Sequence, residues 1–218
     1  MKKNIIFDFD GTIANTLPVI FTVINNLSSQ VGIKQLNWHE FCELRSQNHL
    51  QLIKKYYRII PHLPGLISKA HKEMNNLMDA VTPFDGIIEV LVSLQKKNLK
   101  LGILSSNAKD NIDLFIQKYN LDMFDFIYSE GNLFGKDKAL IKIMKLYSLN
   151  REETIYIGDE TRDIEACKKI GLDIISVSWG FNTKESLQKH NPTFLVENAS
   201  DLLSSIKQIN RSKQSEIL

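Results

Sequence analysis

The sequence predicts an α/β fold in which a doubly wound parallel sheet forms a Rossmann-like core and carries an inserted α-helical cap domain. Short apolar runs alternate with helical patterns over most of the 218 residues. One long interval near the N-terminus has helical patterns but no recognisable strand. A chain of this length can bury one sizeable core together with a smaller insertion.

Short apolar runs are the predicted strands of the sheet. The first covers residues 5–9 and leads into Gly11 and Thr12, which is typical of a buried strand that ends in a turn. The other runs cover residues 99–104, 126–128, 154–157, 174–177 and 194–196. Helical patterns separate these later runs, so we expect parallel strands with helices on both faces.

The predicted helices of the core are amphipathic. In residues 137–147, apolar side chains at positions 140, 143, 144 and 147 fall on one face at helical spacing. The same kind of pattern covers residues 87–97, 110–119, 162–170, 184–190 and 199–209.

The interval after the first strand is predicted to be a helical insertion. Pro61, Pro64 and Gly65 are expected to break its helices. The expected helical stretches are residues 17–31, 38–46, 50–59 and 66–78. We therefore expect a catalytic core of residues 1–12 and 84–210, a cap of residues 13–83 and a flexible tail of residues 211–218.

Composition places the chain among ordinary globular proteins. It has 43% hydrophobic and 24% charged residues and a formal net charge of +2. The positive charge is scattered, and the basic run of residues 54–58 is interpreted as a solvated helix face, so no nucleic-acid partner is expected. Cys42 and Cys167 show no ligand or disulfide spacing and are expected to be buried, reduced thiols.

The N-terminal apolar stretch does not continue far enough to be a targeting or membrane segment. Asp8 and Asp10 interrupt it, and no later run reaches the length of a membrane span. We expect a cytoplasmic protein without a membrane partner. The sequence does not indicate an oligomeric state.

Two groups of acids follow predicted strands. Asp8 and Asp10 flank Phe9, so both carboxylates can project to the same side at a strand's carboxyl end, where open α/β sheets bind ligands. Asp159 and Asp163 follow another strand and share a helix face. Acids in a first helical turn also occur as caps. Together, however, the two groups predict a hard oxygen site suited to Mg²⁺.

Hydroxyl, amide and cationic groups complete this pattern. Ser105 and Ser106, with Asn107, follow a strand at a place where a phosphate can bind, although such serines also serve as helix caps. Lys136 directly follows Gly135 before a helix and can stabilise phosphoryl oxygens. Lys138 is the competing candidate for this role, and a lysine in such a place is often only a solvated surface group.

These four pieces, in this order, resemble the haloacid dehalogenase-like superfamily of hydrolases, and more closely its phosphoglycolate phosphatase-like branch with an α-helical cap. The resemblance covers nearly the whole chain. It implies Mg²⁺-dependent hydrolysis of a small phosphomonoester, phosphoglycolate-like or a sugar phosphate, through an aspartyl-phosphate. It implies that Asp8 is the nucleophile and Asp10 the general acid and base, and that Ser105 and Lys136 bind the phosphoryl group.

The resemblance also implies the metal ligands and shows one departure. Asp8, the backbone carbonyl of Asp10, and Asp159 are implied to bind Mg²⁺ directly, while Asp163 supports its water ligands. Many capped members have an acid shortly after the first motif. This chain has Ile13-Ala14-Asn15-Thr16 there.

Other functions use similar residues. A phosphomutase shares the aspartyl-phosphate, and the visible motifs do not separate it from a phosphatase. A receiver-like phosphoacceptor is disfavoured by the large insertion and by the second group of acids. A dehalogenase has no use for Asp10. A non-catalytic binding protein does not need the full set of catalytic residue types. Arg45 and His49 of the cap are candidates for substrate contact by location alone.

Overall fold

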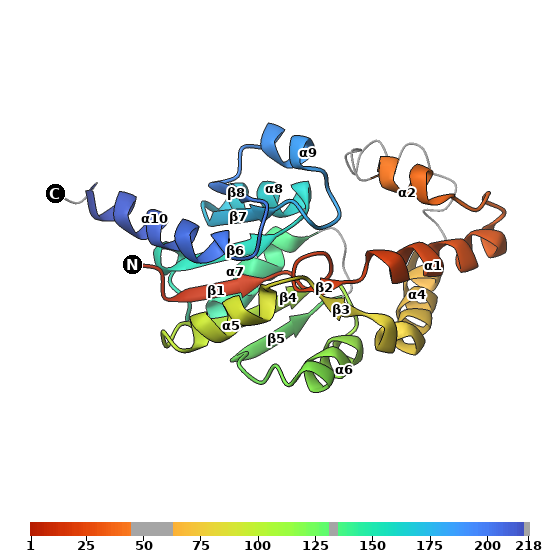
Figure 1. Ribbon diagram of the computed structural model, residues 1–218, viewed down its shortest axis with the longest axis horizontal. Helices are drawn as coiled ribbons and strands as arrows, with labels where there is room; N and C mark the ends of the chain where they lie inside the picture. The colour runs from red at the N-terminus through yellow and green to blue at the C-terminus, as the bar shows by residue number, and fades with distance from the viewer. Residues whose placement is uncertain (45–62, 131–134, 216–218) are drawn as a thin grey trace.

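A parallel sheet forms the centre of the computed structural model, which describes residues 1–44, 63–130 and 135–215. The sheet is six-stranded, in the order β5-β4-β1-β6-β7-β8 (Figure 1). Its strands are β1 (Asn4–Phe7), β4 (Lys100–Ser105), β5 (Phe126–Ser129), β6 (Thr154–Gly158), β7 (Asp173–Val177) and β8 (Phe194–Val196). Every neighbouring pair is parallel, and each strand matches one predicted apolar run, so the predicted sheet is confirmed.

Strand β1 lies between β4 and β6. Phe7, its last residue, is in register with Ile103 of β4 and with Ile157 of β6. After β5 the chain crosses to β6 on the other side of β1, so the direction of winding reverses beside β1. In open α/β sheets, ligands bind beyond the carboxyl ends of the strands at such a reversal.

Helices cover both faces of the sheet (Figure 1). On one face, α5 (Ile87–Gln95), α6 (Lys109–Tyr119) and α10 (Asp201–Ser215) pack against a core that includes Phe7. On the other face, α7 (Lys136–Leu146), α8 (Thr161–Ile170) and α9 (Lys184–Lys189) pack against a core that includes Ile6. Successive strand side chains point to opposite faces, which explains why adjacent residues of β1 belong to different cores.

The inserted segment is helical, as predicted, and lies beyond one end of the sheet (Figure 1). Its described elements are α1 (Leu17–Ser28), η1 (Ser29–Val31), α2 (Trp38–Leu44), α4 (Leu63–Leu77) and η3 (Met78–Ala80). Helices α1 and α4 pack against each other. The helix expected over residues 50–59, the basic run of residues 54–58, Arg45, His49 and Pro61 lie outside the described residues.

Two short strands join the ends of this segment, where no strand was predicted. β2 (Ala14–Asn15) and β3 (Thr82–Pro83) pair in antiparallel fashion. The expectation of an interval without strands was therefore wrong at its two ends. A strand of two residues is too short to show the alternation by which strands are recognised.

Most predicted helix ends lie within three residues of those in the structure, and two of the differences have a clear physical reason. Helix α4 begins at Leu63 and includes Pro64 and Gly65, which were expected to break it. Proline is tolerated in a first helical turn because its missing N–H would have no helical partner there. Helix α10 continues to Ser215, beyond the expected end at residue 209, since Lys, Gln and Arg are residue types with high helix propensity.

The cysteines are only partly as expected. Both are free, and Cys167 is buried, but Cys42 is half-buried. Cys42 belongs to α2, in which the described buried residues are Phe41 and Leu44. Cys42 therefore lies at the edge of the buried face of this helix. None of the described helices is both long and apolar enough to cross a membrane.

Candidate active site

The carboxyl ends of three neighbouring strands bring the predicted site residues together. Asp8 directly follows β1, Ser105 is the last residue of β4, and Asp159 directly follows β6. Because β4, β1 and β6 are adjacent and parallel, these residues meet at one edge of the sheet. Lys136 begins α7, and Asp163 lies in the first turn of α8.

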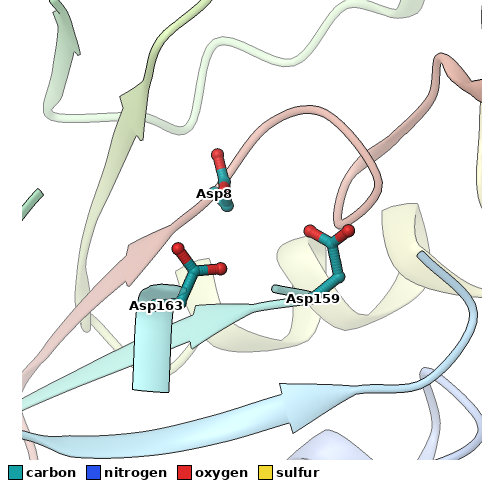
Figure 2. A group of neighbouring side chains, drawn as sticks. All are labelled: Asp8, Asp159 and Asp163. Carbon is teal, nitrogen blue, oxygen red and sulfur yellow. The ribbon is translucent and has the colours of Figure 1, made fainter. Parts of the chain in front are cut away.

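Three buried carboxylates form the centre of the site. One carboxylate oxygen from each of Asp8, Asp159 and Asp163 lies within 4.8 Å of the others. Figure 2 shows the three side chains converging from the segment after β1, the end of β6 and the start of α8. Asp8 is 3% exposed and the other two are fully buried. Such a group of oxygen ligands matches the preferences of a hard divalent cation.

Asp159 is held by neutral donors from two loops. Its Oδ1 accepts a hydrogen bond of 2.8 Å from the Thr12 hydroxyl, and its Oδ2 accepts one of 2.6 Å from the Phe181 backbone N–H. Gly11 has φ +75°, and a Cβ atom there would collide with the Asp159 carboxylate. The glycine of the Asp-x-Asp-Gly-Thr motif is therefore required both by backbone conformation and by close packing on Asp159.

Lys136 bridges two of the acids. Its Nζ forms ion pairs with Asp8 Oδ2 and Asp163 Oδ1 and lies 5.1 Å from the centre of the Tyr156 ring. Burial alone would lower the pKa of Lys136, but the carboxylates of Asp163 and Asp8 raise it above the ordinary value, so the amine stays charged. Lys138, the competing candidate, is exposed.

Acidic groups outnumber basic groups in this cluster. Burial raises the pKa of Asp8 to about 7, although Lys136 opposes the shift. Burial and the neighbouring carboxylates raise the pKa of Asp159 well above its ordinary value. The other nearby cation, Arg162, is paired with Glu160 at 2.5 Å. A bound divalent cation would relieve this imbalance, so the residues fit the predicted Mg²⁺ site.

Asp10 faces a different environment from Asp8. Its Oδ1 accepts a hydrogen bond of 3.0 Å from Asn107 Nδ2, and its Oδ2 lies 3.4 Å from the Ser105 hydroxyl that donates to it. Burial raises the pKa of Asp10, while interactions with the side chains of Thr16, Asn107 and Ser105 lower it. Ser106 follows on the same loop and is half-buried. The acid pair of the first motif therefore divides, with Asp8 toward the acidic cluster and Asp10 toward the end of β4.

Some residues of the site had no role in the sequence prediction. Thr12 belongs to the recognised motif and contacts Asp159, and Asn107 was noted only as an amide near the end of a strand. The segment after β7 contributes the backbone of Phe181, and the Trp179 indole donates to the Thr12 carbonyl at 3.2 Å. The motif could have indicated Thr12. No spacing in the sequence connects residues 179–181 with it.

Comparison with known proteins identifies the family. The sequence model of the haloacid dehalogenase-like hydrolases matches residues 5–177. The phosphoglycolate phosphatase of Synechococcus elongatus is 31% identical over 208 residues, covering 95% of this chain and 98% of that protein. The pyrophosphatase PpaX of Listeria monocytogenes is 26% identical over 217 residues, covering 93% and 95% of the two chains.

Solved structures agree with the fold. A predicted phosphatase from Clostridium acetobutylicum superimposes with a TM-score of 0.83 at 21% identity, covering 95% of this chain and 100% of that chain. CbbY from Rhodobacter sphaeroides in complex with phosphate has a TM-score of 0.76 at 16% identity, with 95% and 100% coverage. The chain belongs to the haloacid dehalogenase-like hydrolases. The prediction of a phosphatase of this family is confirmed at the level of family and enzyme class.

Proposed function

We propose that this chain is a Mg²⁺-dependent phosphatase that hydrolyses a small phosphomonoester through a phosphoryl group carried on Asp8. The observation that supports this best is the division of the acid pair. Asp8 is buried against the Lys136 cation, whereas Asp10 lies beside the Ser105 hydroxyl and outside the acidic cluster. A nucleophile beside a fixed cation and a separate second acid are the groups that a two-step displacement requires.

Asp8 and Asp10 have complementary tasks in the proposed reaction. A carboxylate oxygen of Asp8 attacks phosphorus, the bond from phosphorus to the substrate oxygen breaks, and Asp10 gives its proton to the departing oxygen. A water molecule then attacks the phosphorus of the aspartyl-phosphate. Asp10 takes the proton of this water, the bond to Asp8 breaks, and inorganic phosphate leaves. Asp10 gives up one proton in the first step and takes one up in the second, so it returns to its starting protonation state.

Ser105, Ser106 and Lys136 are proposed to bind the phosphoryl oxygens. The Ser105 hydroxyl lies at the end of β4 and can hydrogen-bond a phosphoryl oxygen in place of its long contact with Asp10. Lys136 carries its charge against Asp8 with only 10% of its side chain exposed, so its field is weakly screened by water. This charge offsets the repulsion between an anionic nucleophile and an anionic phosphate.

The acidic cluster is proposed to hold Mg²⁺. Asp8, Asp159 and the backbone carbonyl of Asp10 would be direct ligands, and Asp163, which is tied to Lys136, would support the water ligands. When bound, Mg²⁺ supplies positive charge at the phosphoryl group.

Residues 13–83 are proposed to form a cap that contributes to substrate choice, over a core of residues 1–12 and 84–210. The 31% identity to a phosphoglycolate phosphatase makes phosphoglycolate the first substrate to test, and the similarity to a pyrophosphatase makes pyrophosphate the second.

The test is phosphate release from a panel of phosphomonoesters and pyrophosphate, with Mg²⁺ and with EDTA. The proposal expects Mg²⁺-dependent turnover of at least one small phosphomonoester. Failure to release phosphate from any member of the panel would contradict it. Isomerisation of a phosphosugar that depends on a bisphosphate primer would indicate a phosphomutase instead.

A further inference from the structure

A chain of asparagine side chains connects Asp10 with helix α4 of the inserted segment. Asn107 Nδ2 donates to Asp10 Oδ1 at 3.0 Å, and Asn111 Nδ2 donates to Asn107 Oδ1 at 2.8 Å. Asn75 of α4 donates through its Nδ2 to Asn111 Oδ1 at 2.8 Å. Asn107 and Asn111 are buried, and Asn75 is half-buried. We call Asn75, Asn111 and Asn107 the asparagine relay.

Backbone groups determine which end of each amide faces which neighbour. The Ala108 N–H can only donate, and its partner at 2.8 Å is therefore the carbonyl oxygen of the Asn107 amide. The His71 carbonyl can only accept, and its partner at 3.3 Å is therefore the NH₂ group of Asn111. With these two orientations determined, Asn111 presents its oxygen to Asn75, and Asn107 presents its NH₂ group to Asp10. A flipped Asn107 would set its oxygen against the Asp10 carboxylate.

The asparagine relay ends on one oxygen of the Asp10 carboxyl group, with which the Thr16 side chain also interacts. Asn107 binds Oδ1, which leaves Oδ2 directed at Ser105, at the end of β4. Asn107 is itself held on three sides. Its backbone N–H donates to Ser105 Oγ at 3.0 Å, and its backbone carbonyl accepts from Ser129 Oγ at 2.5 Å. Its side-chain oxygen accepts from Asn111 Nδ2. The charged groups of the Asp8 cluster take no part in these contacts.

We propose that the asparagine relay positions Asp10 for proton transfer, and that Asn75 makes this positioning depend on how α4 is seated against α6. Asn107, Asn111 and Asn75 are positioning residues, since none of them is proposed to touch substrate. The inference rests on the proposed function, because it requires Asp10 to act as the acid that protonates the departing oxygen.

Two substrates with different leaving groups can distinguish a positioning role of the asparagine relay from a general loss of structure. An alkyl phosphomonoester departs as a strongly basic alkoxide and needs the proton from Asp10, whereas p-nitrophenolate is a good leaving group without one. The ratio kcat/KM covers only the steps up to leaving-group release. A misplaced Asp10 should therefore lower kcat/KM for the alkyl substrate and largely spare p-nitrophenyl phosphate, while damage to the fold or to phosphate binding lowers both.

The experiment compares Asn75→Ala with Asn76→Ala, an exposed neighbour of the same residue type on the same helix. In Asn75→Ala, kcat/KM for the alkyl substrate is expected to fall about 10-fold, while the value for p-nitrophenyl phosphate stays within about twofold. Asn76→Ala is expected to match the wild type on both substrates. Asn107→Ala, which removes the direct contact, should show a larger selective loss of about 100-fold. Thermal melting curves verify that each variant is folded.

The outcomes separate the inference from the function on which it rests. Suppose that the wild type is active. If Asn75→Ala then behaves like Asn76→Ala, or if its kcat/KM falls equally for both substrates, the asparagine relay does not position Asp10. Equal loss of both substrates in folded Asn107→Ala would also overturn the inference. A wild type that hydrolyses neither substrate would overturn the proposed function, and the inference with it.

Discussion

The two halves of the active site are built from opposite kinds of contact. Around Asp8, the close side-chain partners are charged groups of the core: Lys136 from α7, Asp159 after β6 and Asp163 from α8. A neutral backbone group, the Phe9 N–H, also donates to Asp8 Oδ1 at 2.8 Å. Around Asp10 the polar side-chain partners are neutral and include Thr16, Ser105 and Asn107. From Asn107 the contacts continue through Asn111 to α4.

This contrast separates the requirements of the reaction. The charged half provides for binding and attack at phosphorus, which every substrate needs. In the neutral half, Asp10 and the asparagine relay provide for proton transfer, which only some leaving groups need, whereas the Ser105 hydroxyl is proposed to bind the phosphoryl group of every substrate. Changes around Asp8 should thus affect all substrates alike, and changes at Asp10 or in the asparagine relay should discriminate between them.

The largest effect is expected from Asp8→Asn. The amide has nearly the same shape as the carboxylate but is a poor nucleophile, so kcat should fall by at least about 10⁴-fold for alkyl and aryl phosphomonoesters alike. Phosphate release measures the loss, and circular dichroism checks the fold. Retention of the wild-type rate on either substrate would remove Asp8 from the nucleophilic role.

Asp10→Asn is expected to separate the two substrate types. The variant cannot donate a proton, so kcat/KM for an alkyl phosphomonoester should fall by about 10²- to 10⁴-fold, with a much smaller loss for p-nitrophenyl phosphate. A plot of log kcat/KM against leaving-group pKa should become steeper than for the wild type. An unchanged slope would show that Asp10 is not the acid.

Lys136→Ala should reduce activity on both substrate types. Loss of the cation that faces Asp8 and the phosphoryl group is expected to lower kcat/KM by about 10²- to 10³-fold. Lys138→Ala is the matched control, because Lys138 is exposed and lies only two residues away. Its activity should stay within about twofold of the wild type. The reverse ranking of the two variants would assign the role to Lys138.

A smaller effect is expected in stability, and it depends on pH. Burial raises the pKa of Asp8 from 3.8 to about 7, so between these values the folded state keeps a proton that the unfolded state has lost. In the absence of metal, the free energy of unfolding should thus fall as pH rises through this window. For one proton the slope is at most about 1.4 kcal/mol per pH unit.

Mg²⁺ should counteract this loss of stability. Binding requires ionised carboxylates, so Mg²⁺ should raise Tm more at pH 8 than at pH 5. Thermal melts with Mg²⁺ and with EDTA at the two pH values measure the difference. The Asp159→Asn variant, which removes one proposed ligand, is expected to show a smaller rise. A rise that is equal at both pH values would contradict a metal site made of these acids.

The sequence was sufficient for the sheet and for much of the site because these features depend on local patterns. Each apolar run is a strand, and parallel strands necessarily bring the residues after their carboxyl ends to one edge, which is why Asp8, Ser105 and Asp159 could be grouped in advance. The preference for Lys136 over Lys138 also has a helical reason. Two residues along a helix correspond to a turn of about 200°, so only one of the two side chains can face the cluster.

Other features depend on tertiary contacts that no local pattern records. The pairing of Asn75 with Asn111 is set by the contact between α4 and α6, and isolated asparagines in helices carry no signal of a partner 36 residues away. The contact of Phe181 with Asp159 is made by a backbone N–H, which any residue other than proline could supply. Strands of two residues, such as β2 and β3, lie below the length at which alternation can be recognised.

The most direct test of the central claim is to identify the residue that carries the phosphoryl group. The Asp10→Asn variant, treated with p-nitrophenyl phosphate and Mg²⁺ and quenched in acid, should accumulate an acyl-phosphate because the second step lacks its base. Reduction with borohydride followed by peptide mass spectrometry locates the modified aspartate. We expect the modification at Asp8 and its absence in an Asp8→Asn/Asp10→Asn control. A phosphoryl group on another residue, or none formed while p-nitrophenol is released, would contradict the proposed mechanism.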